Sequence, residues 1–189
     1  MMKHGIFPRL FLVAALALAA APAFAQLDLF ASDPLLEAIR FNNIEQVEKR
    51  LLRGGSTEIA DFDRRTAIIY AATTGNADIM EILIKYKAQI THRDKLGNTA
   101  LFYAASLGNI DALELLIEKG AKVNGENKQG ITPLMEAARN GRLEVARILV
   151  DARADTARRD YTGRTALMWA DWSRKAAVAR YLRGAGVRE

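Results

Sequence analysis

The sequence predicts an all-α solenoid, in which short helix–turn–helix units stack one after another and are joined by loops. Three kinds of residue recur with a period of 33 residues and support this prediction. The first is a threonine that can cap a helix, found at Thr66, Thr99, Thr132 and Thr165. The second is an alanine pair farther along that helix, found at Ala71-Ala72, Ala104-Ala105 and Ala137-Ala138. The third is a glycine that can end the helix, found at Gly75, Gly108 and Gly141. A single unit of this size cannot bury its own apolar stripe, so neighbouring units are expected to bury it together.

Residues 130–160 show the unit most clearly. Thr132 can cap the first helix with its hydroxyl, and Pro133 then stands at the first helical position, where its missing N–H costs nothing. Leu134 and the alanine pair that follows it fall on one helix face and form a narrow apolar stripe. Gly141 breaks this helix, and the helical pattern of apolar residues resumes directly after it. The unit is therefore predicted to be two helices followed by a polar loop.

This unit resembles the ankyrin repeat. Its first helix starts with Thr132-Pro133-Leu134, followed by Ala137-Ala138, and the period of 33 residues is that of the ankyrin family. The resemblance extends over residues 33–189. It implies an ankyrin repeat solenoid, with helix–turn–helix units separated by β-turn/loop fingers.

The predicted repeat domain begins and ends with units that depart from the pattern. In the first unit, Asp33 can cap a helix as well as threonine does, and Gln46 and Arg50 replace apolar residues of later units. In the last unit, Arg174 replaces the turn glycine. Polar residues suit terminal repeats, because these have a neighbour on one side only. The predicted units are an N-terminal capping repeat over residues 33–63, full repeats over 64–94, 95–127 and 128–160, and a C-terminal capping repeat over 161–189.

Two further departures occur within the repeats. Lys87 and Arg153 end second helices at a position where Gly54 and Gly120 stand in other units. If the backbone there is left-handed, a non-glycine residue costs up to about 1–2 kcal/mol. The resemblance also implies a histidine after Thr-Pro-Leu that bridges neighbouring units, and we expect apolar packing to replace its hydrogen bonds. The residues in its place are Ile69, Phe102, Met135 and Met168.

Residues 1–25 are predicted to be a secretory signal peptide. Lys3 and Arg9 precede a short apolar run, and Ala23-Phe24-Ala25 forms a small-x-small cleavage pattern. The alternative is an uncleaved membrane anchor, but the apolar run is shorter than the roughly 20 residues that a spanning helix needs. We therefore expect cleavage after Ala25, a linker over residues 26–32, and a periplasmic or secreted protein without stable membrane insertion.

The remaining chain offers little for catalysis or metal binding. The sequence has no cysteine, and His92 is the only histidine after the predicted cleavage site. No second histidine or cysteine is therefore available as a metal ligand, and a catalytic triad would have to use His92. The glycines are spaced by the repeat period, unlike those of a phosphate-binding loop. Asp94, Asn127 and Asp160 recur in loops and are interpreted as turn formers. We expect no enzyme activity, no cofactor and no metal.

The ankyrin resemblance implies that partners bind the loop tips and the exposed side of each first helix, which together line a concave groove. Aromatic and arginine side chains among polar ones suit an interface hot spot, although an ordinary solvated face is the alternative for any single residue. Trp169, in contrast, is predicted to lie in the core. The predicted partner-binding residues are Phe62, Arg65, Arg93, Lys95, Leu96, Asn98, Leu107, Lys128, Gln129, Ile131, Arg139, Asn140, Arg159, Tyr161, Arg164 and Trp172, with Thr73, Thr74, Ser106 and Asp171 on the same surface.

The sequence thus favours a monomeric, non-enzymatic module for protein–protein interaction. Without the first 25 residues the chain has 25 basic and 22 acidic side chains, a net charge of +3, which gives only weak non-specific attraction and makes nucleic acid an unexpected partner. The alternative function is binding of an anionic polymer or of lipid headgroups by basic loop tips, and steep loss of binding with salt would support it. The basic residues concerned are Arg65, Arg93, Lys95, Lys128, Arg139, Arg158, Arg159 and Arg164.

Overall fold

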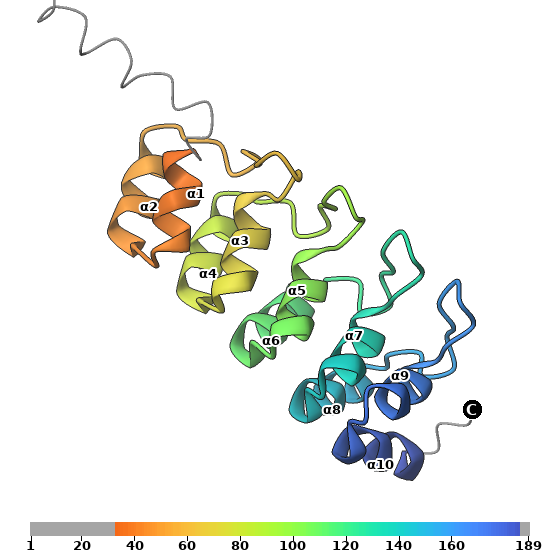
Figure 1. Cartoon of the computed structure of the whole chain (residues 1–189). Helices are drawn as coiled ribbons and strands as arrows, with labels where there is room; N and C mark the ends of the chain where they lie inside the picture. Colours follow the sequence, from red (N-terminus) through yellow and green to blue (C-terminus); the bar gives the residue numbers. More distant parts are fainter. Residues whose placement is uncertain (1–32, 186–189) are drawn as a thin grey trace, which may run out of the picture. The chain divides into compact units, whose positions relative to one another are not determined.

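The computed structural model describes residues 33–185, which form ten helices arranged in five consecutive pairs. The odd-numbered helices pack against one another in one row, called the inner row, and the even-numbered helices form a second row beside it, called the outer row (Figure 1). Loops project from the ends of the pairs toward one side (Figure 1). The helices are α1 (Pro34–Arg40), α2 (Ile44–Leu52), α3 (Ala67–Thr74), α4 (Ala77–Lys85), α5 (Ala100–Leu107), α6 (Ile110–Glu118), α7 (Pro133–Asn140), α8 (Leu143–Asp151), α9 (Ala166–Trp172) and α10 (Ala176–Gly184). The predicted all-α repeat fold is confirmed.

The first helix of each pair begins at the predicted capping residue. The side chains of Thr99, Thr132 and Thr165 each accept a hydrogen bond from the backbone N–H three residues later, which satisfies a donor at the helix start. Asp33 caps α1 in a similar way, because its side chain accepts a hydrogen bond from the backbone N–H of Leu35. Thr66 is the exception, because its hydroxyl is buried and has no hydrogen-bond partner.

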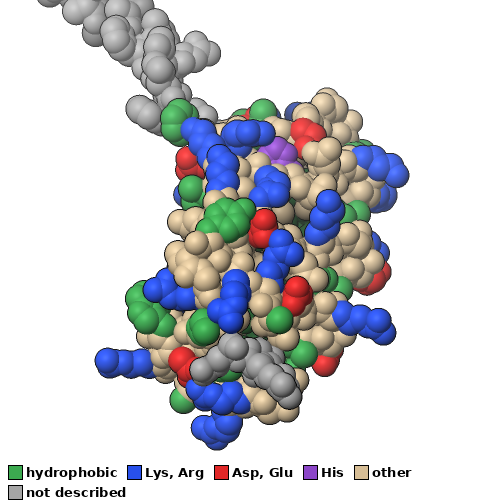
Figure 2. Space-filling view, turned by 90° about the vertical axis from the view of Figure 1, so that its right-hand side faces the viewer, with side chains coloured by type: hydrophobic (Ala, Val, Ile, Leu, Met, Phe, Trp, Pro, Cys, Tyr) green, Lys and Arg blue, Asp and Glu red, His purple; other side chains and the backbone are tan. Residues whose placement is uncertain are grey.

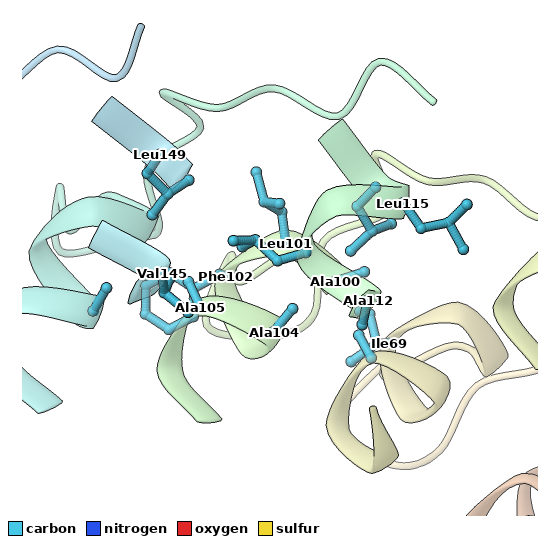
Figure 3. Close-up of a cluster of buried hydrophobic side chains, with 14 of the residues drawn as sticks. Ile69, Ala100, Leu101, Phe102, Ala104, Ala105, Ala112, Leu115, Val145 and Leu149 are labelled. Atoms are coloured by element: carbon cyan, nitrogen blue, oxygen red, sulfur yellow. The ribbon is translucent and has the colours of Figure 1, made fainter. Parts of the chain in front are cut away.

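The buried residues of the described chain form one continuous cluster that runs from pair to pair. Small alanines on the inner row let neighbouring helices approach closely, and larger side chains fill the space between the two rows (Figure 3). Ile69, Phe102 and Met135 are buried, which confirms the expected apolar packing at the position of the missing histidine, whereas Met168 in the last repeat is only half-buried. Trp169 is also buried, as predicted.

The ends of the second helices adopt the left-handed backbone that the sequence indicates. Gly54 and Gly120 both have φ of 85°, and the corresponding residues Lys87 and Arg153 have φ of 68° and 61°. A Cβ atom at either glycine would meet no heavy atom within 4 Å, so this slot has open space around it. The unfavourable feature of Lys87 and Arg153 is therefore the backbone conformation itself.

We expect Arg153→Gly to raise the free energy of unfolding by roughly 0.5–1 kcal/mol, because glycine relieves the left-handed strain. The gain is partly offset by the greater flexibility of glycine in the unfolded chain. The urea midpoint of unfolding measures the change, and Arg153→Ala, which keeps a Cβ, is the matched control that should show no gain. A lower midpoint for Arg153→Gly would contradict the explanation.

Several sequence predictions concern residues outside the described range. The proposed signal peptide, the linker over residues 26–32 and the final residues 186–189 all lie there. Within residues 33–185, none of the helices combines the length and the apolar character required to cross a membrane.

Candidate functional site

The loop between successive repeats forms a compact finger that is closed by its own side chain. In the second finger, Oδ1 of Asp94 accepts hydrogen bonds from the backbone N–H groups of Leu96 and Asn98, both at 2.8 Å. Asn127 and Asp160 make the equivalent turns in the next two fingers, and Asp61 accepts from the Arg65 N–H in the first. The predicted role of these residues as turn formers is confirmed.

Backbone hydrogen bonds join each finger tip to the one before it. The N–H of Lys95 donates to the carbonyl of Asp63 at 2.9 Å, and the N–H of Lys128 donates to Leu96 at 2.9 Å. The N–H of Tyr161 continues the series by donating to Gln129 at 3.1 Å. The tips therefore form a hydrogen-bonded row rather than four independent loops. We call the surface made by these tips and the exposed sides of the inner-row helices the finger face.

An aromatic donor on the first helix anchors three of the four fingers. The hydroxyl of Tyr70 donates to Asp61 at 2.8 Å, and the hydroxyl of Tyr103 donates to Asp94 at 2.7 Å. In the last repeat the indole N–H of Trp169 donates to Asp160 at 2.9 Å. In each case the aromatic residue follows the aspartate by nine residues. This periodic pair anchors the fingers and was not predicted from the sequence, although the repeat register contains the signal.

The third full repeat breaks this pattern with Glu136, which occupies the aromatic position. Its side chain is only 3% exposed. Oε1 accepts from the guanidinium of Arg139 at 2.7 Å, from the amide of Asn140 at 2.9 Å and from the hydroxyl of Ser106 at 3.1 Å, while Oε2 is buried without a partner. The residue that closes the finger also changes, because Asn127 replaces the aspartate. Its side-chain amide N–H donates a hydrogen bond to Oδ1 of Asn98 at 3.0 Å.

These contacts change the pKa values of two finger aspartates, Asp61 and Asp160. Burial raises the pKa of Asp61, but hydrogen bonds from the Arg65 backbone, the Tyr70 hydroxyl and the Arg65 guanidinium outweigh it, so the pKa lies below its ordinary value. Burial likewise raises the pKa of Asp160, and hydrogen bonds from Thr162, from the Arg164 N–H and from Trp169 lower it by more. Burial and the bond to Asp61 raise the pKa of Tyr70.

The lowered pKa values predict loss of stability in acid. A carboxylate with a lower pKa in the folded state contributes stability above its unfolded pKa, near 3.8, and that stability disappears as the pH falls through the folded pKa. Asp160→Asn places an amide against the Trp169 N–H, so we expect lower stability at pH 7 and a smaller further loss between pH 5 and pH 2 than in the unmodified protein. Urea unfolding followed by circular dichroism across this range provides the measurement, and an unchanged acid dependence would contradict this role of Asp160.

Most of the predicted partner-binding residues lie on the surface, and the structure brings many of them together on the finger face. Phe62, Tyr161 and Trp172 are 88%, 70% and 66% exposed, respectively. The other exposed members are Arg93, Lys95, Leu96, Leu107, Lys128, Gln129 and Arg159, with Asp171 beside Trp172, and the half-buried members are Arg65, Thr73, Thr74, Ser106, Arg139, Asn140 and Arg164.

Two of the predicted partner-binding residues are not surface residues. Asn98 is buried because its side chain lies between fingers, where its Oδ1 accepts from the Asn127 amide. Ile131 is buried at the base of its finger, where its N–H is bound by the Asn127 side chain. Both belong to the packing that holds neighbouring repeats together, so their assignment to an exposed binding surface was wrong.

Two open hollows lie on the outer row, away from the finger face. One has a volume of about 550 Å³, lies among α4, α6 and α8, and is lined by Ala77, Glu81, Asp111, Glu114, Leu115, Ile117, Glu118 and Ile148. The other, of about 570 Å³, lies along α4 and reaches Lys119. The first hollow carries four carboxylates, in contrast to the basic finger face.

The described residues show no arrangement for metal chemistry. Among residues 33–185, no group of three or more histidine, aspartate or glutamate side chains is placed to hold a metal ion. The Nε2 atom of His92 lies 2.9 Å from the carbonyl oxygen of Arg64 in the preceding finger, so His92 makes a structural contact to that finger.

Stacked helix pairs that depend on their neighbours for burial define the class of helical repeat proteins, which act through extended surfaces. The family model described as ankyrin repeats (3 copies) matches residues 35–127 and 123–188, and the chain therefore belongs to the ankyrin repeat family. Membership indicates a protein–protein interaction module in a family that is typically non-enzymatic. No curated protein has a significant match to the chain.

Proposed function

We propose that this chain is an exported, non-enzymatic ankyrin repeat module that binds a partner protein through its finger face. The observation that carries the proposal is the exposure of three large aromatic side chains, Phe62, Tyr161 and Trp172, on one surface. Exposed aromatic groups surrounded by polar residues are typical of interface hot spots.

The aromatic side chains are held in place by the repeats beneath them, which reduces the entropy lost on binding. The Tyr161 backbone N–H is bound to Gln129, and its hydroxyl donates to Glu126 at 3.2 Å. A Cβ atom on Gly130 would come within 2.6 Å of the Tyr161 ring, so the ring lies directly against that glycine. Trp172 packs edge-to-face on Trp169 with ring centroids 5.3 Å apart.

Capture of a partner by the mature protein, followed by direct binding of the two purified proteins, tests the proposal. The variant Tyr161→Ala with Trp172→Ala should fold normally and lose the partner. The matched control is Phe41→Ala with Leu52→Ala, which removes two side chains that are also strongly exposed but lie on α2 and at its turn to α1. If the control variant loses the partner and the first variant keeps it, the finger face is not the binding surface.

Export is the second part of the proposal, and it rests on the charged, apolar and small-residue segments of residues 1–25. The intact mass of the protein in the exported fraction tests it. A mature species that begins at Gln26 is expected, whereas a membrane-bound species that keeps Met1 would contradict cleavage.

A further inference from the structure

Arg65 and Arg164 occupy the same position three repeats apart, but only one of them is neutralised by nearby acids. Each guanidinium lies over the aromatic ring five residues later, at 5.4 Å from the centre of Tyr70 and 5.1 Å from the centre of Trp169. Arg65 also forms ion pairs with Asp61 at 2.7 Å and with Asp63 at 3.5 Å. Arg164 has no ion pair among the described residues.

The local sequence explains why Arg164 stays without an acid. Thr162 occupies the position of Asp63, and its hydroxyl accepts from the Arg164 guanidinium at 2.9 Å. Asp160, which corresponds to Asp61, has its two oxygens bound by the N–H groups of Thr162 and Arg164, by the Thr162 hydroxyl and by the Trp169 indole. The guanidinium therefore lies at the end of the finger face without an ion pair among the described residues.

Two tryptophans hold this guanidinium in place. Arg164 lies 5.1 Å from the centre of Trp169 and 5.5 Å from the centre of Trp172. Stacking on aromatic rings orients a guanidinium and leaves donors at its edge available for a planar acceptor. A carboxylate can accept two parallel hydrogen bonds from such a donor, which adds geometric specificity as well as binding energy.

Further basic side chains that form no ion pair among the described residues continue along the finger face. Lys95 lies over the Phe62 ring at 3.5 Å, and Arg93 donates only to the backbone carbonyls of Gly97 and Glu126. Neither these side chains nor Lys128 and Arg159 form an ion pair among residues 33–185. Figure 2 shows this face, on which blue basic groups and green apolar groups are interspersed and red acidic groups are few.

We propose that the finger face binds an extended acidic segment of the partner protein, with one carboxylate on Arg164 beside Trp172 and others at the fingers of Lys128 and Lys95. This inference rests on the proposed function and names the chemistry of the partner. Helices that pack side by side lie about 8–10 Å apart, and an extended chain advances about 3.3 Å per residue. The basic groups of successive repeats therefore match carboxylates about three residues apart.

The interspersed aromatic groups favour a peptide over a simple polyanion. A polyanion or an anionic membrane requires only positive charge, and its binding falls steeply with salt. Phe62, Tyr161 and Trp172 instead offer apolar contacts between the basic groups, which suit the side chains between the acids of a peptide. The observations thus fit an acidic peptide that also carries apolar side chains.

Fluorescence anisotropy with two labelled synthetic peptides tests the proposal on the full mature chain at physiological salt. One peptide has glutamate at every third position with leucine and serine between, and the other has the same composition with its glutamates contiguous. We expect the spaced peptide to bind at least about tenfold more tightly, and Arg164→Gln to weaken it by about tenfold or more. Arg147→Gln is the matched control, because this guanidinium also lies over an aromatic ring, at 5.4 Å from the centre of Tyr181, but on the outer-row helix α8. It should change the affinity by less than about twofold.

Several results would overturn the proposal. Equal affinity for the two peptides, or equal effects of Arg164→Gln and Arg147→Gln in variants with unchanged circular dichroism, would refute the specific carboxylate site. Binding of polyphosphate or of vesicles containing phosphatidylglycerol, without binding of the spaced peptide, would assign the face to another class of ligand. A dimer in sedimentation that Arg164→Gln converts to monomer would identify a second copy as the occupant. If the peptide fails while the captured partner still requires Tyr161 and Trp172, only this inference is wrong and the proposed function stands.

Discussion

We expect Leu134→Ala to lower the free energy of unfolding by about 2–5 kcal/mol, because it removes buried methyl groups and leaves a cavity. Leu134 lies on the inner-row helix α7 and is among the largest fully buried side chains of the described chain. Helix α7 packs against both α5 and α9, so the cavity opens in a seam that two neighbouring repeats share. The stability of a repeat array depends on such nearest-neighbour interfaces, and we therefore also expect a broader unfolding transition.

Urea unfolding followed by circular dichroism measures both effects. Leu52→Ala is the matched control, because it makes the same chemical change at a side chain that is 74% exposed on α2. The control should change the free energy of unfolding by less than about 0.5 kcal/mol. Equal effects of the two substitutions would show that burial in the inner row does not determine the stability of the array.

The fold could be predicted from the sequence because the residues that start and end the helices recur at the same positions of successive repeats. Thr132 and Gly141 mark the start and the end of α7, and the same residue types stand at the same positions of α3 and α5. The left-handed backbone of Lys87 and Arg153 was also predictable, since glycine occupies the slot in other repeats. Repetition thus turns weak local signals into a strong prediction.

The details of the candidate site were less predictable because they depend on contacts between repeats. The period places Asn98 and Ile131 in loops, but it does not show which side of a finger faces the next one. Arg139 also looks like a free surface cation in the sequence, whereas it forms an ion pair with the buried Glu136. Ser106 of the previous repeat completes that contact, so the burial of Glu136 depends on the stacking of two units.

The pairing of an aromatic donor with a finger aspartate leads to the second large effect. We expect Trp169→Ala to lower the free energy of unfolding by about 3–5 kcal/mol, because it removes a buried indole and leaves a cavity. It also deprives Asp160 of a donor at 2.9 Å. Arg139 and Arg164 lose the ring over which their guanidinium groups lie. Because α9 belongs to the last repeat, part of the loss should appear as early unfolding of the C-terminal repeats.

Substitution by the other two aromatic residues separates the hydrogen bond from the packing. Trp169→Tyr introduces the residue that Tyr70 and Tyr103 provide in earlier repeats, so its hydroxyl should donate to Asp160 and the loss should be less than half that of alanine. Trp169→Phe keeps an aromatic ring but no donor, and should be about 1 kcal/mol less stable than Trp169→Tyr. Urea unfolding at neutral pH gives this order of stability. Equal stability of the phenylalanine and tyrosine variants would mean that packing alone anchors the last finger, and that the aspartate serves only to close its turn.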